Sequence, residues 1–316
     1  MRHWLRGIGK IFCLTFFLSI FGCASGGSKT ESSRLPSSSP TAPAPRCGIL
    51  NDLELHAHRG SNDRPENMIS AFERGVDRGA DLIELDLQIS KDDQVIVAHD
   101  AFLRADCLDS RGKELKERIF FRDLTLAQIK TFDCGSNSKT GSPVPGEKVP
   151  TLGEVFKVLK NRTTSRGRPI GLNIELKYNP TQPQFYPSRD VYAALVLKEV
   201  GDSGWDSSRL LLQSFDVGIL EMLRSQGAEY RLSPLLSQAK DGIATARRLR
   251  TDTVTPHYGQ VTPETIRDFH LAGLRVIPWT VNTPEDAKRM IDLGVDGLIT
   301  DRLDLFLLSG YFCGGR

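Results

Sequence analysis

The stretch DLIELDLQISKDDQVIVAHD, residues 81–100, decides the fold. In its first half, Glu84 and Asp86 alternate with isoleucine and leucine. Side chains of a strand point alternately to opposite faces, so this pattern predicts one aliphatic face packed on helices and one acidic face turned the other way. The second half, VIVAHD, is another β-rich run. Together the two halves predict adjacent strands of a mixed α/β domain.

Only a few residues, 91–94, separate these two runs. Such a short link permits an antiparallel hairpin but not a parallel crossover, which needs a dozen residues or more. With Asp92 and Asp93 as the two turn residues, Asp86 would face His99 directly across the hairpin. The sequence therefore predicts that these two side chains are cross-strand neighbours.

Strand-like and helix-like segments alternate on both sides of the hairpin. Helical spacing covers residues 66–78 and a segment that begins near Thr151. The other strand candidates are LELHAH (53–58), GLNIEL (171–176), LLLQSF (210–215), YRLSPLL (230–236), DTVTP (252–256), RVIPWTV (275–281) and DGLIT (296–300). With the second hairpin arm set aside, eight strands remain, which predicts a (β/α)8 TIM barrel. Residues 101–150 lack the alternation and read as an insertion, and long insertions commonly form lids or substrate-side loops.

Three carboxylates are placed where strands of this barrel would end. Glu84 and Asp86 share one face of their strand, and Glu175 closes another. Active sites of such barrels are built at the C-terminal ends of the strands. Converging carboxylates repel one another unless a cation neutralises them, and an all-oxygen set suits Mg²⁺ or Ca²⁺. We expect these residues to hold one divalent cation; the alternative for any one of them is a solvated strand-end charge.

Two histidines and two basic residues fall at the same rim. His58 ends the first strand and His99 ends the hairpin. Imidazoles titrate near neutral pH, so the pair could act as general acid and general base. Arg59 and Lys177 could bind a phosphate, or they could form salt bridges with the carboxylates.

Four further polar or aromatic residues belong to the same region. Gln213 and Trp279 fall at strand ends and could line a substrate pocket. His56 shares the face of the first-strand histidine but lies deeper, which favours a core or supporting role. Glu66 is expected at the rim, away from the metal.

The N-terminus differs in kind from the rest. Three basic residues precede an apolar run over residues 11–21, a pattern typical of a secretory signal peptide over residues 1–22. The run is shorter than the roughly 20 residues that a membrane-spanning helix needs. The letters IFGC, ending at Cys23, resemble a bacterial lipobox, in which the cysteine receives a lipid; secretion without a lipid is the alternative.

Export through the predicted signal peptide bears on the domain boundaries and on the pairing of the cysteines. Residues 23–48, rich in Ser, Pro and Ala, predict a flexible membrane tether, and residues 49–316 are expected to form the barrel domain. An oxidising compartment favours disulfides. We expect Cys107 to pair with Cys134 and Cys47 with Cys313, with free thiols as the alternative. The net charge of +2 offers no electrostatic case for a nucleic-acid partner.

A series of short motifs completes the pattern. In chain order they are HRG (58–60), RPEN (64–67), AF (71–72), GADLIELDLQISKDD (79–93), VIVAHD (95–100), IELK (174–177), QSF (213–215), WTVN (279–282) and GVDGLITD (294–301). This order resembles the glycerophosphodiester phosphodiesterases, a TIM-barrel family related to phosphatidylinositol phospholipase C. The resemblance departs from the family pattern at Met68, where threonine is usual, and at Asp93, which replaces a turn glycine.

The resemblance implies a divalent metal held by residues matching Glu84, Asp86 and Glu175, and two histidines matching His58 and His99. It also implies hydrolysis of a glycerophosphodiester to sn-glycerol 3-phosphate and an alcohol. A phospholipase D or C acting on intact lipids would share the site but need an apolar entrance, whereas the insertion is mixed and charged. A non-catalytic surface lipoprotein would be expected to lack at least one of the five polar residues, and all are present.

Overall fold

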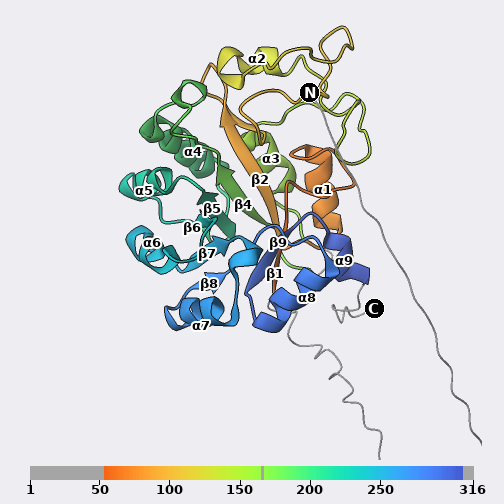
Figure 1. The fold of residues 1–316 in the computed structure, drawn as a ribbon. Coiled ribbons are helices and arrows are strands. Elements are labelled where there is room, and N and C mark those ends of the chain that lie inside the picture. The colour runs from red at the N-terminus through yellow and green to blue at the C-terminus, as the bar shows by residue number, and fades with distance from the viewer. Residues whose placement is uncertain (1–52, 165–166, 309–316) are drawn as a thin grey trace, which may run out of the picture. The chain divides into compact units, whose positions relative to one another are not determined.

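The structure is a computed structural model that describes residues 53–164 and 167–308. Within them, eight parallel strands in the order β8-β7-β6-β5-β4-β2-β1-β9 carry helices on their outer side (Figure 1). Backbone hydrogen bonds close the ring, because Ile299 N donates to the carbonyl of Pro278 at 2.9 Å. The predicted (β/α)8 barrel is confirmed. The strands are β1 Glu54–Ala57, β2 Leu82–Ile89, β3 Val95–Val97, β4 Gly171–Leu176, β5 Leu210–Ser214, β6 Arg231–Leu236, β7 Thr253–Pro256, β8 Arg275–Val276 and β9 Gly297–Thr300.

Helices follow the barrel strands, and several of them begin at a side-chain cap. At α3, the Thr151 hydroxyl accepts from the Glu154 amide while the Glu154 carboxylate accepts from the Thr151 amide, which is a capping box. The helix expected from residue 66 begins later, at Ile69, because Asn67 lies in a turn with φ 59°. The helices are α1 Ile69–Asp77, α2 Leu126–Ile129, α3 Leu152–Leu159, α4 Arg189–Ser203, α5 Val217–Ser225, α6 Gly242–Leu249, α7 Pro263–Leu271, α8 Pro284–Leu293 and α9 Leu303–Leu308, with 3-10 turns η1 Phe121–Asp123, η2 Pro183–Phe185, η3 Ser207–Arg209 and η4 Tyr258–Gln260.

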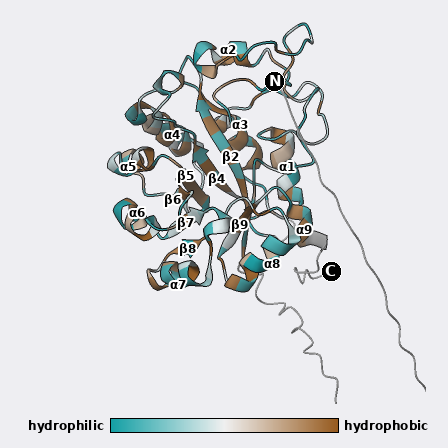
Figure 2. Cartoon of the chain, viewed as in Figure 1, coloured by the Kyte–Doolittle hydropathy of each residue, from teal (hydrophilic) through white to brown (hydrophobic). Residues whose placement is uncertain are grey.

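Alternation along β2 sorts its residues between two environments. Ile83, Leu85 and Leu87 belong to the main hydrophobic core between the sheet and the helices. Glu84 and Asp86 face the other way, yet they are equally buried. The strands are largely brown in Figure 2, and the helices that cover them carry both colours, as amphipathic helices do. Aliphatic burial outside the sheet, about 1.5–3 kcal/mol for each large side chain, therefore offsets the cost of a polar barrel interior.

The hairpin between β2 and β3 differs from its prediction by one residue. The strands are antiparallel, as expected, but Leu87 pairs with Val97. The Ser90 amide donates to the Gln94 carbonyl at 3.0 Å, so the loop contains three residues, with Asp93 in the left-handed region at φ 58°. Three-residue hairpin loops place a left-handed residue last, which the two-residue prediction overlooked. The expected pairing of Asp86 with His99 is therefore wrong.

The insertion over residues 101–150 has a small core of its own. Leu103, Phe121, Ile129 and Val149 are buried there together with Met68, which precedes α1. The cluster also contains Ile96 of β3, so it anchors the insertion to that strand. Figure 1 shows α2, which belongs to the insertion, near the tip of β2. The insertion is thus packed onto the barrel rim.

One of the two predicted disulfides is confirmed. Cys107 and Cys134 are bonded, with their Cα atoms 4.0 Å apart, and both belong to the buried cluster of the insertion. Cys47 and Cys313, like the predicted signal peptide (1–22), the tether (23–48) and Cys23, lie outside the described residues. Among residues 53–164 and 167–308, none of the helices combines the length and apolar character needed to cross a bilayer.

Candidate active site

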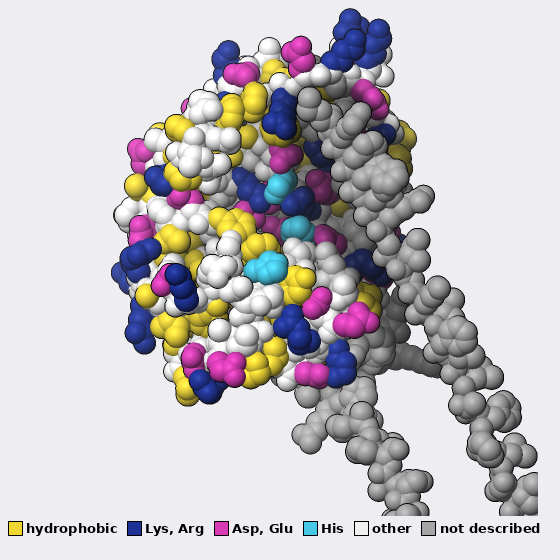
Figure 3. All heavy atoms as spheres, viewed as in Figure 1, with side chains coloured by type: hydrophobic (Ala, Val, Ile, Leu, Met, Phe, Trp, Pro, Cys, Tyr) yellow, Lys and Arg dark blue, Asp and Glu magenta, His cyan; other side chains and the backbone are white. Residues whose placement is uncertain are grey.

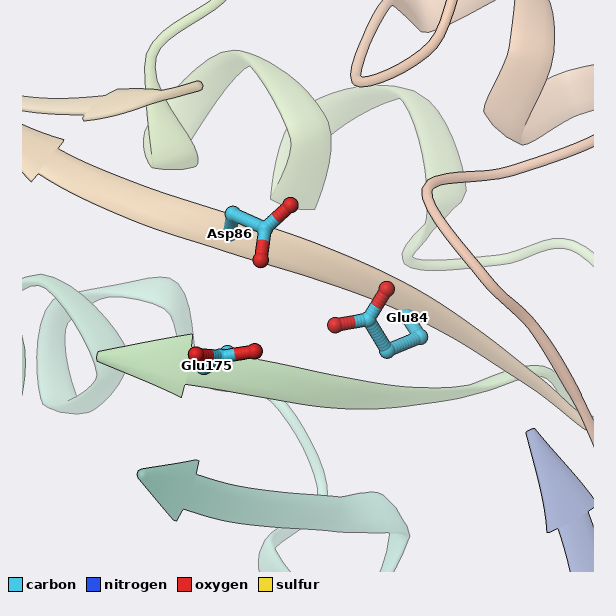
Figure 4. A group of neighbouring side chains, drawn as sticks. All are labelled: Glu84, Asp86 and Glu175. Atoms are coloured by element: carbon cyan, nitrogen blue, oxygen red, sulfur yellow. The ribbon is translucent and has the colours of Figure 1, made fainter. Parts of the chain in front are cut away.

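Three buried carboxylates meet between two neighbouring strands, at the middle of β2 and the end of β4. Glu84 and Asp86 project from β2, and Glu175 projects from the end of β4 toward them (Figure 4). The parallel register places Asp86 directly beside Glu175. One oxygen from each of the three carboxylates lies within 4.8 Å of the others. Strand alternation and parallel pairing are thus enough to gather the predicted metal ligands at one point.

The basic residues of the rim contact these carboxylates. Lys177 Nζ lies 2.8 Å from Glu175 Oε1 and 3.1 Å from Asp86 Oδ1. Arg59 Nε lies 3.3 Å from Asp86 Oδ2, and its Nη1 donates to Glu66 Oε2 at 3.1 Å. The salt-bridge alternative for Arg59 and Lys177 is therefore observed. Glu66 lies at the rim, outside the carboxylate triad, as expected.

Charge and burial shift the pKa values of the three carboxylates in different directions. Burial would raise the pKa of Asp86, but the charges of Lys177 and Arg59 outweigh it and hold that pKa well below its ordinary value. Burial, with the charge of Asp86 added, raises the pKa of Glu84 to about 7. Burial also raises the pKa of Glu175 to about 8, against the opposing charge of Lys177. Two of the three groups therefore retain protons near neutral pH unless further positive charge arrives.

The triad fits a hard divalent cation. All its donors are carboxylate oxygens, the ligands that Mg²⁺ and Ca²⁺ prefer. Within the described part of the chain, buried Gln213 Oε1 accepts no hydrogen bond, and buried Asp86 Oδ1 has the ion pair with Lys177 but no hydrogen bond. Buried acceptors without hydrogen bonds are costly, and coordination would satisfy them. The buried triad can bind a divalent metal.

Asn67 supports the triad and was not identified from the sequence. Its Nδ2 donates to Asp86 Oδ2 at 2.8 Å, and its Oδ1 accepts from the Asp86 amide at 3.2 Å. Arg59, with φ 54°, points its own amide at Glu84 Oε2 at 2.9 Å. Left-handed backbone is unusual at arginine and is typically kept where a functional group must be aimed. The motif RPEN contained the signal for Asn67, but only its neighbour Glu66 was placed at the rim.

His58 is held by a carboxylate from the far end of the chain. Its Nδ1 lies 2.6 Å from Asp301 Oδ1, and the two residues are 243 positions apart. Asn282 holds the other oxygen of Asp301, donating to Oδ2 at 2.6 Å. Burial opposes protonation of His58, but the hydrogen bond to Asp301 and the charge of Glu84 outweigh it and raise the pKa of His58. Sequence reasoning missed Asp301 and Asn282, although each ends one of the quoted motifs.

His99 reaches the site although it does not pair with Asp86. β3 ends at Val97, and Ala98 N donates to the Asp86 carbonyl at 2.9 Å. His99 follows this last ladder bond, and its Nδ1 lies 3.0 Å from Asp100 Oδ1. A bend after the strand, rather than cross-strand pairing, thus brings the imidazole to the rim.

A small cavity of about 130 Å³ lies at the centre of the barrel mouth. Its walls include both histidines, Glu84, Glu175 and the predicted pocket residues Gln213 and Trp279. Gln213 Nε2 donates to Glu84 Oε1 at 3.4 Å, and Trp279 Nε1 donates to the Thr255 carbonyl at 2.8 Å. His56 lies deeper and fully buried, with Nδ1 3.1 Å from Asn173 Nδ2, as expected of a supporting residue. Figure 3 shows histidines beside basic and acidic side chains near the middle of the face drawn.

Two larger cavities open around this centre. One, of about 500 Å³, is lined by His99 and Lys177 and extends toward the insertion. The other, of about 470 Å³, is lined by His58 and Arg59 and extends toward the loop after β9. Each histidine thus stands between the triad and a separate cavity, an arrangement suited to a substrate with two arms.

Known proteins are similar to this chain in sequence and in fold. The model of the glycerophosphoryl diester phosphodiesterase family matches residues 58–305. A glycerophosphodiester phosphodiesterase from Caldanaerobacter subterraneus is 33% identical over 250 residues, which cover 78% of this chain and 92% of that protein. A glycerophosphodiester phosphodiesterase from Bacillus subtilis is 31% identical over 264 residues, covering 79% and 84%.

A solved structure agrees in fold. A phosphodiesterase from Oleispira antarctica, in complex with the product sn-glycerol-3-phosphate, has a TM-score of 0.67 at 21% identity and covers 81% of this chain and 97% of that one. The family match spans both histidines and all three carboxylates. The chain therefore belongs to the glycerophosphoryl diester phosphodiesterase family and is a phosphoric diester hydrolase.

Proposed function

We propose that the chain hydrolyses glycerophosphodiesters to sn-glycerol 3-phosphate and an alcohol, with His58 and His99 as general acid and base. The observation that carries this proposal is the central cavity, which is lined by both imidazoles together with Glu84 and Glu175. The complex of the Oleispira antarctica phosphodiesterase with sn-glycerol-3-phosphate supports the product.

The imidazoles are oriented by carboxylates. Because Nδ1 of His58 bonds Asp301 and Nδ1 of His99 bonds Asp100, Nε2 of each ring is left for the reacting atoms. One Nε2 would take a proton from the attacking hydroxyl while the other donates a proton to the leaving oxygen. This division needs two histidines on different sides of the phosphate, and it is supported by the fact that each histidine lines a separate larger cavity.

The basic residues have a second task. Arg59 and Lys177 stand beside the carboxylates at the cavity wall, where their N–H groups can donate to phosphate oxygens. Glu84, Asp86 and Glu175 would hold one Mg²⁺ or Ca²⁺ ion, which supplies positive charge beside the phosphate and polarises it. The nucleophile is water or a neighbouring glycerol hydroxyl.

Release of sn-glycerol 3-phosphate from a panel of glycerophosphodiesters tests the proposal. We expect turnover with Mg²⁺ or Ca²⁺, loss of turnover with a chelator, and recovery when the ion is restored, because the buried triad needs a cation to ionise fully. Intact phospholipid serves as control substrate. Activity that survives chelation would exclude the metal, and faster hydrolysis of intact phospholipid would favour the phospholipase alternative. A transient cyclic glycerol phosphate among the products would identify a glycerol hydroxyl as the nucleophile.

We also propose that the enzyme is exported and anchored through a lipid on Cys23, with plain secretion as the alternative. The support is the basic and apolar pattern of residues 1–22 and the IFGC letters. In a bacterial host, we expect the wild type to incorporate labelled palmitate and sediment with membranes. The variant Cys23→Ser should incorporate none and leave the membrane fraction, whereas Cys13→Ser should behave as wild type. If Cys23→Ser incorporates no palmitate but still sediments with membranes, the lipid anchor on Cys23 is contradicted.

A further inference from the structure

The cavity on the His99 side is built largely from loops outside the barrel. Phe102, Arg118 and Phe120 come from the insertion, and Phe185 comes from the loop between β4 and α4. The rings of Phe120 and Phe185 are stacked, with centroids 4.0 Å apart and planes within 5°. Phe102 meets Phe120 edge-on at 5.8 Å. A rigid aromatic wall therefore joins two separate loops beside the catalytic centre.

The charged side chains that line this cavity already have partners. Glu175 is paired with Lys177 at 2.8 Å, and Asp100 with His99 at 3.0 Å. The guanidinium of Arg118 lies over the ring of Phe102, 4.7 Å from its centroid. A bound divalent cation keeps Glu175 ionised. Two acidic and two basic side chains, besides the imidazole, then line the cavity, and their formal charges cancel. Each carboxylate that a cationic head group such as choline would reach is already paired with a basic side chain or an imidazole. The head group would also be repelled by Arg118.

Neutral hydrogen-bonding groups complete the wall. Asn179, Gln182 and Gln184 line the cavity. Asn179 is engaged by Thr181 and by Gln182 Oε1, whereas the amide of Gln184 can donate to and accept from hydroxyl groups of a ligand. The volume of about 500 Å³ would hold roughly seventeen waters at about 30 Å³ each. Ethanolamine or choline would fill only part of it, whereas a ring of carbon atoms with several hydroxyls would reach both the amides and the aromatic wall.

The cavity on the His58 side suits the other half of the substrate. Three arginines line it, Arg59, Arg64 and Arg302, against two acidic residues, Glu66 and Asp301, so the lining keeps an excess of positive charge. Positive charge favours the phosphate-bearing half of the diester, which is the same in every glycerophosphodiester. The variable alcohol is then left for the aromatic cavity.

We propose that the cavity formed by the insertion and the β4–α4 loop is a subsite for a bulky, uncharged, cyclic polyol as the leaving alcohol. This inference rests on the proposed function, because it concerns the alcohol that the same reaction releases. The aromatic wall packs on the ring, and the amides bond its hydroxyls. Selectivity would then come from a segment added to the barrel, while the triad and histidines perform the same chemistry on every substrate.

Comparison of kcat/KM for glycerophosphoinositol, glycerophosphocholine and glycerophosphoethanolamine tests the subsite. We expect the inositol diester to be preferred by about tenfold or more, since lost packing in a pocket costs about this factor. In Phe120→Ala and Phe185→Ala, the ratio of the inositol to the ethanolamine diester should fall about tenfold. Gln184 is exposed, so Gln184→Ala should lower the same ratio without endangering the fold.

Phe132→Ala is the matched control, because Phe132 packs on the core of the insertion without lining the cavity. Its substrate ratio should equal that of the wild type. Equal or faster turnover of the choline or ethanolamine diester, or an unchanged ratio in Phe120→Ala and Gln184→Ala, would overturn the subsite and leave the proposed function intact. Failure to hydrolyse any of the three diesters would overturn the proposed function and the subsite with it.

Discussion

Replacing either His58 or His99 with alanine is expected to lower kcat by about 10²–10⁴-fold, the range typical of losing a general acid or base. Each imidazole lines the central cavity, and each is oriented by a carboxylate through Nδ1. Neither belongs to the hydrophobic core, so the variants should stay folded. Steady-state release of sn-glycerol 3-phosphate, with thermal unfolding in parallel, measures both effects.

His270→Ala is the control for these variants. His270 forms an ion pair with Asp296 at 3.0 Å on the outside of the barrel, so its loss should leave kcat unchanged. Near-normal kcat in a folded His58→Ala or His99→Ala variant would contradict the assignment of that histidine. Asp301→Asn should keep part of the activity and displace the pH profile, because the group that raises the pKa of His58 is then neutral.

Glu175→Gln is expected to reduce activity by more than about 100-fold, since even the groups that merely support metal ligands cost 10–100-fold when lost. The same change should abolish the thermal stabilisation that Mg²⁺ or Ca²⁺ gives the wild type, which is about 2.7 kcal/mol at one hundred times the Kd. Differential scanning calorimetry with and without the ion measures this effect. An undiminished metal-induced shift in Glu175→Gln would show that the ion binds elsewhere. Glu264→Gln, at an exposed glutamate on α7, should bind metal as the wild type does.

The pH dependence of the metal effect has a definite sign. Without metal, the pKa values of Glu84 and Glu175 rise from the ordinary 4.5 to about 7 and about 8. Between pH 4.5 and 8 the unfolded chain therefore releases these protons before the folded chain does, and the metal-free protein loses stability as the pH rises. Metal binds the ionised carboxylates, so its affinity should increase over about pH 6–8 and level off above. An affinity that falls with rising pH in that window would contradict these shifts.

Much of the architecture follows from patterns that are local in the chain. Alternation of acids with aliphatic residues along β2 requires only that successive side chains of a strand point to opposite faces. Parallel pairing then puts Asp86 beside Glu175, because strand ends in a (β/α)8 barrel share one rim. The alternation of strands and helices, and the threonine cap of α3, are visible on the same local scale.

The hairpin shows where local reasoning ends. Its existence follows from the shortness of the link, but its register depends on whether the loop has two or three residues. The length of the loop depends on the backbone of Asp93, and the letters KDD alone do not predict its left-handed φ of 58°. A one-residue error was enough to pair His99 with the wrong partner.

The (β/α)8 barrel, the three carboxylates and the two histidines could all be read from the sequence, because strand periodicity and the rule that barrel sites form at strand ends need no distances. The remaining features of the site could be found only in the tertiary structure. Asp301 meets His58 across 243 positions of chain, and the aromatic cavity exists only because two loops stack one ring from each. Long-range contacts and burial are properties of the closed barrel, and they set the pKa values, the orientation of the imidazoles and the shape of the cavity that receives the alcohol.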